Sequence, residues 1–168
     1  MAFKNDLSAE YVRSLLDYDP ETGEFRFRIR KGGRAKVGKI AGSFDKKKYH
    51  RIKIDGHLYL ASRIAWLYVT GEWPKALIDH EDRDPSNTRF ANLREATYIE
   101  NARNCRKPRR NTSGYKGVSW HKTRKEWRSY IRVEGKLIHL GAFFSAEEAS
   151  DAYKAAARKH FGDFANIG

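Results

Sequence analysis

One stretch in the middle of the chain joins a short apolar run to a dense polar tail: Leu77-Ile78-Asp79-His80-Glu81-Asp82-Arg83-Asp84-Pro85-Ser86-Asn87-Thr88-Arg89-Phe90-Ala91-Asn92-Leu93. The apolar run delivers Asp79 and His80 side by side into a loop rich in Asp, Asn and Ser. Residues 98–104 bring further amide side chains. Carboxylate and amide oxygens suit a hard cation, and an imidazole is a good proton acceptor. The stretch therefore predicts a cation site next to a base.

The composition is that of a folded and strongly basic protein. Of the 168 residues, 40% are hydrophobic and 13% aromatic, which allows one domain or two small ones. The positive charge is uneven: residues 1–101 hold 19 Lys and Arg against 15 Asp and Glu, and residues 102–168 hold 15 against 6. This asymmetry favours a polyanionic partner for the C-terminal part, nucleic acid before a membrane. The alternative is a basic face that serves only solubility.

Cysteine usage and hydropathy indicate where such a chain works. Cys105 is the single cysteine, which excludes a disulfide framework and a thiolate zinc site. No apolar run approaches the roughly 18 residues that span a bilayer, and the N-terminus lacks a signal-peptide pattern. We expect a reducing, cytoplasmic setting, with no membrane partner and no small-molecule substrate.

The N-terminal half predicts short elements. Ser8 can cap a helix with Tyr11, Val12, Leu15 and Leu16 on one face, and residues 19–23 form a turn. Residues 25–30 alternate strictly, so three arginines share one strand face, which is either solvated or laid along a phosphate backbone. Further strands are expected around residues 40–44, 49–54 and 58–61. Ser62 is expected to cap a helix that Gly71 ends.

The C-terminal part predicts a small βββα domain. Residues 103–113 are basic, contain one Pro and no acid, and read as a linker. Strands are expected at residues 115–120, 126–133 and 136–141. Ser145 and Glu148 form a capping box for a helix that runs to about Phe161. The face of that helix is small: Ala149, Ala152, Tyr153 and Ala156.

An ordered series of motifs resembles the HNH endonucleases of phage and intron homing type, over residues 58–104. The series is Gly71-Glu72-Trp73-Pro74, Ile78-Asp79-His80, Asn87-Thr88-Arg89-Phe90-Ala91-Asn92-Leu93-Arg94 and Glu100-Asn101. The resemblance implies a ββα-metal unit in which His80 is the general base. It also implies that Asp79 and Asn101 bind one divalent cation, Mg²⁺ or Mn²⁺, while Asn92 pins the loop. The catalytic set is thus His80, Asp79, Asn92 and Asn101.

Several alternatives stay open at this site. Glu100 or Asn104 could replace Asn101 as the second ligand. Asp79 and His80, as strand neighbours, can serve one phosphate only at a strand end, because adjacent side chains point to opposite faces. Many relatives carry His where this chain has Ser62, which favours the rival hypothesis of a non-catalytic DNA-binding regulator with a decayed HNH unit. Asp82 and Asp84 are expected to form turns.

Residues 113–167 resemble the plant ethylene-response-factor (APETALA-2 type) DNA-binding domain. Tyr115-Lys116-Gly117-Val118, the Trp127 strand, Ile138-His139-Leu140-Gly141-Ala142-Phe143 and the ending Phe161-Gly162-Asp163-Phe164-Ala165-Asn166 carry the resemblance. It implies a three-stranded sheet that enters the major groove, with a helix behind it. Alternation places Val118, Trp127, Ser129, Ile131, Val133, Ile138 and Leu140 toward the helix. The expected DNA contacts are Lys116, Ser119, His121, Lys122, Arg124, Lys125, Arg128, Tyr130, Arg132, His139, Arg106, Lys107, Arg109 and Arg110.

These observations predict an α+β protein: a ββα-metal (HNH) nuclease region plus a small three-stranded antiparallel sheet packed on one helix. The domains are expected at residues 1–102, with a motif core at 58–104, and at 114–168, with a basic linker at 103–113. The expected function is hydrolysis of phosphodiester bonds in double-stranded DNA by a monomer that nicks one strand.

Overall fold

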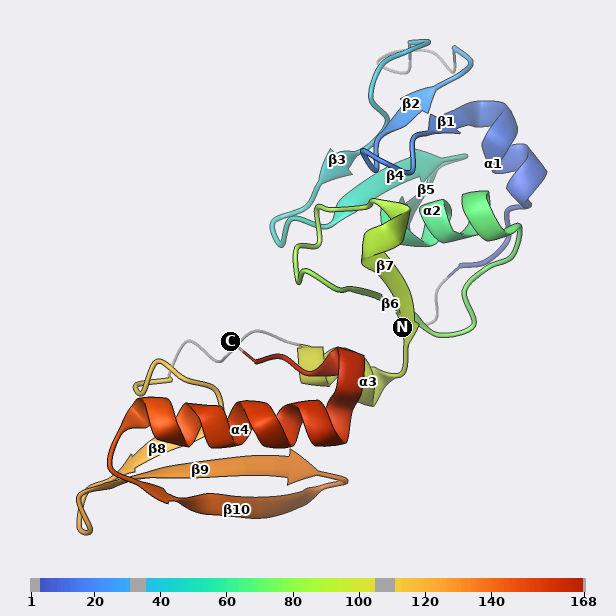
Figure 1. Ribbon diagram of the computed structural model, residues 1–168. Coiled ribbons are helices and arrows are strands. Elements are labelled where there is room, and N and C mark those ends of the chain that lie inside the picture. Colours follow the sequence, from blue (N-terminus) through green and yellow to red (C-terminus); the bar gives the residue numbers. More distant parts are fainter. Residues whose placement is uncertain (1–3, 31–35, 105–110, 168) are drawn as a thin grey trace. The chain divides into compact units, whose positions relative to one another are not determined.

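A computed structural model describes residues 4–30, 36–104 and 111–167 (Figure 1). They form two compact units, Met1–Thr97 and Tyr98–Gly168. Both units combine helices with small antiparallel sheets, so the predicted α+β class is confirmed. The second unit begins at Tyr98, before the boundary expected at residue 102, and most of the predicted linker lies outside the described residues. In the described parts of the chain, no helix is long and apolar enough to cross a membrane.

The first unit contains two helices and three small sheets. Its elements are α1 (Ala9–Leu15), β1 (Leu16–Tyr18), β2 (Phe25–Phe27), β3 (Ser43–Phe44), β4 (His50–Ile54), β5 (His57–Leu60), α2 (Ala61–Thr70), β6 (Leu77–His80), the 3-10 turn η1 (Phe90–Asn92) and β7 (Leu93–Ala96). The sheets are β1-β2, β3-β4-β5 and β6-β7. One apolar core joins them, and its largest fully buried side chains include Phe25, Leu16 and Ile52.

Local signals placed most of these elements correctly. The Ser8 hydroxyl accepts a hydrogen bond from the Tyr11 N–H (3.1 Å), which confirms the predicted cap of α1. Asp55 and Gly56 both have positive φ in the turn between β4 and β5, as the expected hairpin requires. Gly71 ends α2 in the left-handed conformation, as predicted.

Two expectations for this unit were wrong. The strand expected over residues 25–30 stops at Phe27, because its partner β1 begins only at Leu16, directly after α1. Ser62 does not cap α2: the helix begins at Ala61 straight from β5, and Ser62 is buried inside its first turn. Its position before an apolar run suggested a cap, but the cap position is Leu60, two residues earlier, where β5 ends.

The second unit has the expected βββα order, preceded by a short helix. Its elements are α3 (Tyr98–Asn104), β8 (Val118–His121), β9 (Glu126–Val133), β10 (Lys136–Phe143), α4 (Ala146–Phe161) and η2 (Gly162–Phe164). The sheet has the order β10-β9-β8, and α4 lies along one of its faces (Figure 1). The Ser145 hydroxyl accepts from the Glu148 N–H (3.1 Å), so the predicted cap of α4 is confirmed.

Small residues let α4 approach the sheet closely. Ala149 and Ala157 are fully buried, and Tyr153 between them is nearly so. Gly117 has φ +73, and a Cβ there would lie 2.2 Å from the Tyr153 ring. Ile138, expected toward the helix, is 38% exposed because it lies on the edge strand β10. On the face of the sheet away from α4, Ser119, Arg132 and His139 are exposed, and Arg128 and Tyr130 are partly exposed.

Candidate active site

The β6–β7 hairpin fixes the positions of Asp79 and His80. Their register partners are Arg94 and Leu93 respectively. Strand alternation therefore sends the two side chains to opposite faces of the hairpin, and His80 is the last residue of β6. From the sequence, Asp79 and His80 were expected to serve one phosphate only at the end of a strand. At the end of the strand, an acid and a base can approach one phosphate from different sides.

Asp79 is buried and ion-paired. It is 5% exposed, and its Oδ2 accepts hydrogen bonds from both Nε (3.0 Å) and Nη2 (2.9 Å) of Arg94. A carboxylate so far removed from water needs a positive partner, and the cross-strand arginine supplies one. Arg94 was part of the family motif, but no role was predicted for it. Strand pairing is what brings it to Asp79.

His80 is also buried, at 7% exposure, and the Tyr49 ring lies edge-on to it with 6.3 Å between ring centroids. Burial lowers the pKa of His80 below its ordinary value, while the charges of Asp82, Asp79 and Asp84 act in the opposite direction. The imidazole is therefore a neutral base at pH 7. Sequence reasoning missed Tyr49, because its only signal was an aromatic residue after three lysines.

The loop after His80 is held by its own polar side chains. Asn92 Oδ1 accepts from the Asp82 N–H (3.0 Å), and Asn92 Nδ2 donates to Asp82 Oδ1 (3.0 Å) and to the Asn87 carbonyl (3.0 Å). Asp82 Oδ1 also accepts from the Asp84 N–H (2.8 Å), and Asp84 Oδ1 accepts from the Ser86 N–H (3.0 Å). Asp82 and Asp84 are thus turn formers, as predicted.

A second set of contacts ties this loop to the core. The Thr88 hydroxyl donates to the Gly23 carbonyl (2.7 Å), and the Tyr18 hydroxyl donates to the Thr88 carbonyl (2.6 Å). Gly23 has φ +76, and a Cβ there would lie 2.6 Å from the Arg89 nitrogen, so the approach requires glycine. These partners are far apart in sequence, and no local pattern predicts them.

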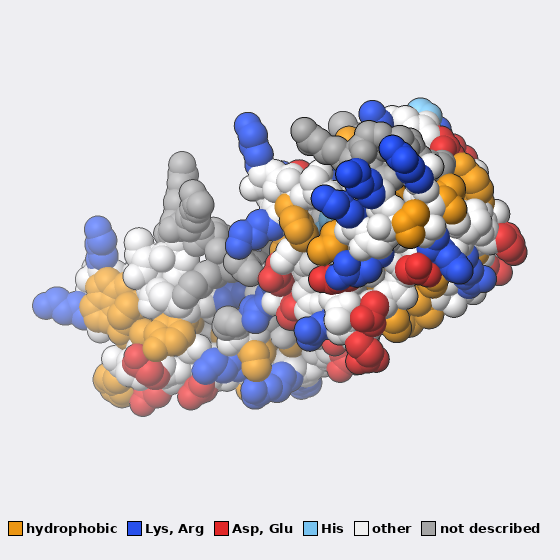
Figure 2. Space-filling view, turned by 90° about the horizontal axis from the view of Figure 1, so that it is seen from above, with side chains coloured by type: hydrophobic (Ala, Val, Ile, Leu, Met, Phe, Trp, Pro, Cys, Tyr) orange, Lys and Arg blue, Asp and Glu red, His pale blue; other side chains and the backbone are white. Residues whose placement is uncertain are grey.

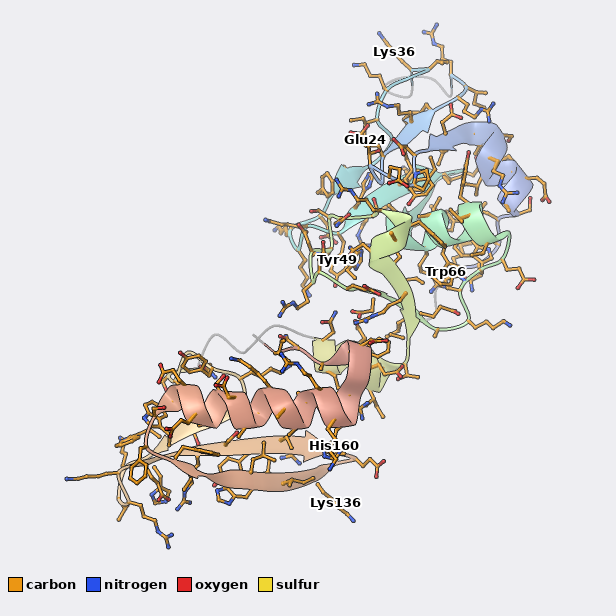
Figure 3. The ribbon with its side chains drawn as sticks, viewed as in Figure 1. Glu24, Lys36, Tyr49, Trp66, Lys136 and His160 are labelled. Atoms are coloured by element: carbon orange, nitrogen blue, oxygen red, sulfur yellow. The ribbon has the colours of Figure 1, made fainter. Side chains whose placement is uncertain are left out.

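Aromatic contacts meet the loop at both ends. Tyr49 contacts His80 at its start, and Trp66 of α2 contacts Phe90 near its end, with 5.5 Å between ring centroids. Figure 3 labels Tyr49 and Trp66 in the first unit.

Arg63, next to Ser62, donates to the carbonyls of Ala76 (3.0 Å) and Pro74 (3.3 Å), which fixes the segment that leads into β6.

The donor chemistry around Asp79 fits one hard cation with few protein ligands. Within residues 4–30, 36–104 and 111–167, no three His, Cys, Asp or Glu side chains gather into a metal-binding group. Mg²⁺, however, usually keeps several waters and takes only one or two carboxylates. Asp79 would hold the cation in place of the Arg94 guanidinium, which donates two hydrogen bonds to its Oδ2.

The other candidate ligands belong to the second unit. Asn101, Glu100 and Asn104 lie on α3. The end of that helix is tied to its own unit: Asn166 Nδ2 donates to the Asn104 carbonyl (3.2 Å), and Arg103 lies over the Phe161 ring at 4.5 Å. Which of the three is the second ligand stays a prediction.

Five of the residues that were predicted to contact DNA lie on one face of the β8–β10 sheet. Ser119 opposes Arg128, and Tyr130 opposes His139, on the sheet face away from buried Ser129 and Ile131. The Tyr130 and His139 rings lie 4.9 Å apart. Arg132 is exposed on the same face.

The other residues that were predicted to contact DNA do not belong to this set on the sheet face. Lys116 Nζ donates a hydrogen bond to the Arg103 carbonyl (2.8 Å), so this ammonium group is held by a backbone oxygen of its own unit. His121 Nδ1 accepts from the Arg124 N–H (3.2 Å), inside the exposed turn with Lys122 and Lys125. The linker residues Arg106, Lys107, Arg109 and Arg110 lie outside the described residues.

The chain is similar to a plant protein over part of its length and to a solved structure over most of its length. The chain is 40% identical over 62 residues to APETALA2-like protein 2 of Oryza sativa subsp. indica, which is 37% of this chain but only 14% of that protein. The structure of "DNA binding and cleavage by the HNH homing endonuclease I-HmuI" is similar with a TM-score of 0.43 and 20% identity, over 96% of this chain and 91% of that one. A likeness of this size carries no argument about the fold.

The site region itself matches a family. The model for "HNH endonuclease" matches residues 59–103, which include Asp79, His80 and Asn92. Protein 3.8 of Escherichia phage T7 is 39% identical over 103 residues, 61% of this chain and 84% of the relative. On these matches the chain belongs to the HNH endonuclease family.

Proposed function

We propose that this chain is a metal-dependent endonuclease that nicks double-stranded DNA and leaves 3′-hydroxyl and 5′-phosphate ends. Family membership alone supports the coarser statement, a DNA nuclease or DNA-binding function. The observation that carries the proposal is the end of β6, where the His80 imidazole, with its pKa lowered by burial, and the buried carboxylate of Asp79 are neighbours on opposite faces of the hairpin.

Each residue has a role that its surroundings support. His80, kept unprotonated by burial, takes the proton of the attacking water. Asp79 would hold the divalent cation, which when bound supplies charge neutralisation at the phosphate and assistance to the leaving 3′ oxygen. Asn92 keeps the loop after His80 in one shape. One base and one cation serve one strand, so a monomer is expected to nick.

Positive charge near His80 supports a phosphate backbone as the partner. The turn between β3 and β4 carries Lys46, Lys47 and Lys48, all exposed, and Tyr49 follows directly. Tyr49 is the ring that contacts His80. Figure 2 shows Lys and Arg side chains gathered on the first unit beside exposed hydrophobic side chains. Such groups position DNA without reading its sequence.

The second unit is proposed to direct the enzyme to its target. The exposed face of β8, β9 and β10 presents Arg128, Tyr130, Arg132 and His139, and a small sheet fits the major groove. The 62-residue similarity to a plant APETALA2-like protein supports this role. Glu126 accepts two hydrogen bonds from Arg128 (2.9 and 2.8 Å), so that guanidinium is pre-oriented on the face.

The nuclease proposal is tested on supercoiled plasmid. The full chain is incubated with Mg²⁺, with Mn²⁺ or with chelator, and nicked circles are measured over time. Metal-dependent nicking is expected for wild type, with a loss of at least about 100-fold in His80→Ala. His57→Ala, which removes an exposed histidine from the same unit, is the matched control and should nick normally.

A wild-type protein that shifts DNA on a gel but never nicks it with either metal would overturn the nuclease and support the non-catalytic regulator. For targeting, Arg132→Ala is compared with Lys159→Ala, an exposed residue of α4. Only the first should weaken DNA binding, by about 1–3 kcal/mol if it contacts a base edge. Equal affinity of the two variants would remove the sheet face from the proposal.

A further inference from the structure

Among the ion pairs of the described residues, the one between Arg94 and Asp79 is the most buried. The side chains are 16% and 6% exposed, and two hydrogen bonds from the guanidinium converge on the single oxygen Oδ2. By contrast, the pair between Arg26 and Glu24 in the same unit is 49% and 42% exposed. The strength of a charge pair rises as water is removed. The Arg94 guanidinium is therefore bound strongly to the Asp79 carboxylate.

Stability alone is a weak explanation for such a pair. Two buried charges must both lose their hydration, and apolar residues of similar volume often stabilise a protein as well or better. The buried carboxylate of this pair, Asp79, lies one residue before His80, which ends β6. A positive guanidinium therefore sits on the one carboxylate that the proposed function assigns to a cation.

Arg94 also has a second acidic group within reach. Its Nη1 is 3.7 Å from Oε1 of Glu81, whose side chain is 53% exposed. The guanidinium thus lies between a buried carboxylate and a solvated one. If Asp79 is taken by another cation, Glu81 can keep Arg94 partnered in a place where its desolvation cost is lower.

We infer that Arg94 is a built-in counter-ion that competes with the divalent cation for Asp79. This inference rests on the proposed function, because it needs Asp79 to be a cation ligand. The competition weakens cation binding to the protein alone. Removing the guanidinium takes two hydrogen bonds and a positive charge away from Oδ2, so a divalent cation can bind that oxygen without displacing them.

The test measures cation binding, not cleavage. Mn²⁺ is titrated into the full chain without DNA, and the free ion is followed by electron paramagnetic resonance. Arg94→Gln is expected to bind Mn²⁺ at least about tenfold more tightly than wild type. Arg94→Lys keeps a charge without the two-fold hydrogen bonding, so it should fall between them. Arg26→Gln removes one positive charge from an exposed pair of the same unit and should match wild type.

Thermal unfolding provides a second readout. Mn²⁺ should raise the melting temperature of Arg94→Gln more than that of wild type, because the cation replaces a lost partner. If Arg94→Gln does not fold, the Lys variant still decides: affinity equal to or weaker than wild type overturns the competition.

Asp79→Asn separates the two proposals. If this variant loses Mn²⁺ binding while Arg94→Gln and Arg94→Lys bind like wild type, the counter-ion inference fails and the cation site stands. If Asp79→Asn binds Mn²⁺ as well as wild type, Asp79 is not a ligand, and both the inference and that part of the proposed function are overturned.

Discussion

The Asn92→Ala substitution tests how the loop after His80 is held. Asn92 makes three side-chain hydrogen bonds of 3.0 Å, two with Asp82 and one with the Asn87 carbonyl. Each is expected to contribute about 0.5–1.5 kcal/mol net, and water replaces them in part, so the loss should be about 2 kcal/mol. For a unit of this size that corresponds to a fall of roughly 10 °C in melting temperature.

Calorimetry of the full chain measures the loss, and plasmid nicking measures its consequence. We expect nicking to fall by about 100-fold, since small misplacements of a reacting group are costly. Asn87→Ala is the comparison variant from the same loop: its side chain makes two hydrogen bonds against three for Asn92, donating to Asp82 Oδ2 (2.6 Å) and accepting from the Arg89 N–H (3.3 Å). An Asn92→Ala protein no less stable than Asn87→Ala, or one that nicks at the wild-type rate, would refute this account of the loop.

Three further predictions concern the first unit. Thr88→Val leaves the Gly23 carbonyl without its hydroxyl donor and should cost about 2 kcal/mol by calorimetry, whereas Thr88→Ser should cost less; equal stability of both variants would contradict the anchor. His50 Nε2 is hydrogen-bonded to the Ala41 carbonyl, and burial lowers the pKa of this histidine. As pH falls, the unfolded chain therefore takes up a proton near pH 6.5 before the folded chain does, and the free energy of unfolding should fall below that pH. A pH profile that is the same in His50→Gln as in wild type would contradict this. Lys47→Ala should weaken DNA binding and reduce the salt slope by about 1, and an unaltered slope would remove that lysine from the phosphate contacts.

Local sequence determined the elements whose causes are local. The Ser8 and Ser145 caps, the Asp55-Gly56 hairpin and the Gly71 helix end all depend on residues within a few positions of each other, and the structure confirms them. The turn-forming roles of Asp82 and Asp84 were predictable for the same reason. Ser62 shows the limit, since the strand that runs into α2 displaced the expected cap.

The sequence alone also placed an acid and a base at Asp79 and His80, in a motif order that identifies the HNH endonuclease family. What surrounds them was decided by the tertiary structure. Arg94 reaches Asp79 through strand register, Tyr49 reaches His80 from the segment between β3 and β4, and Thr88 reaches Gly23 across 65 residues. Residue identity supplies the reactive groups, but charge partner, burial and loop shape depend on contacts between distant segments. Such contacts leave no periodic or local signal in a single sequence.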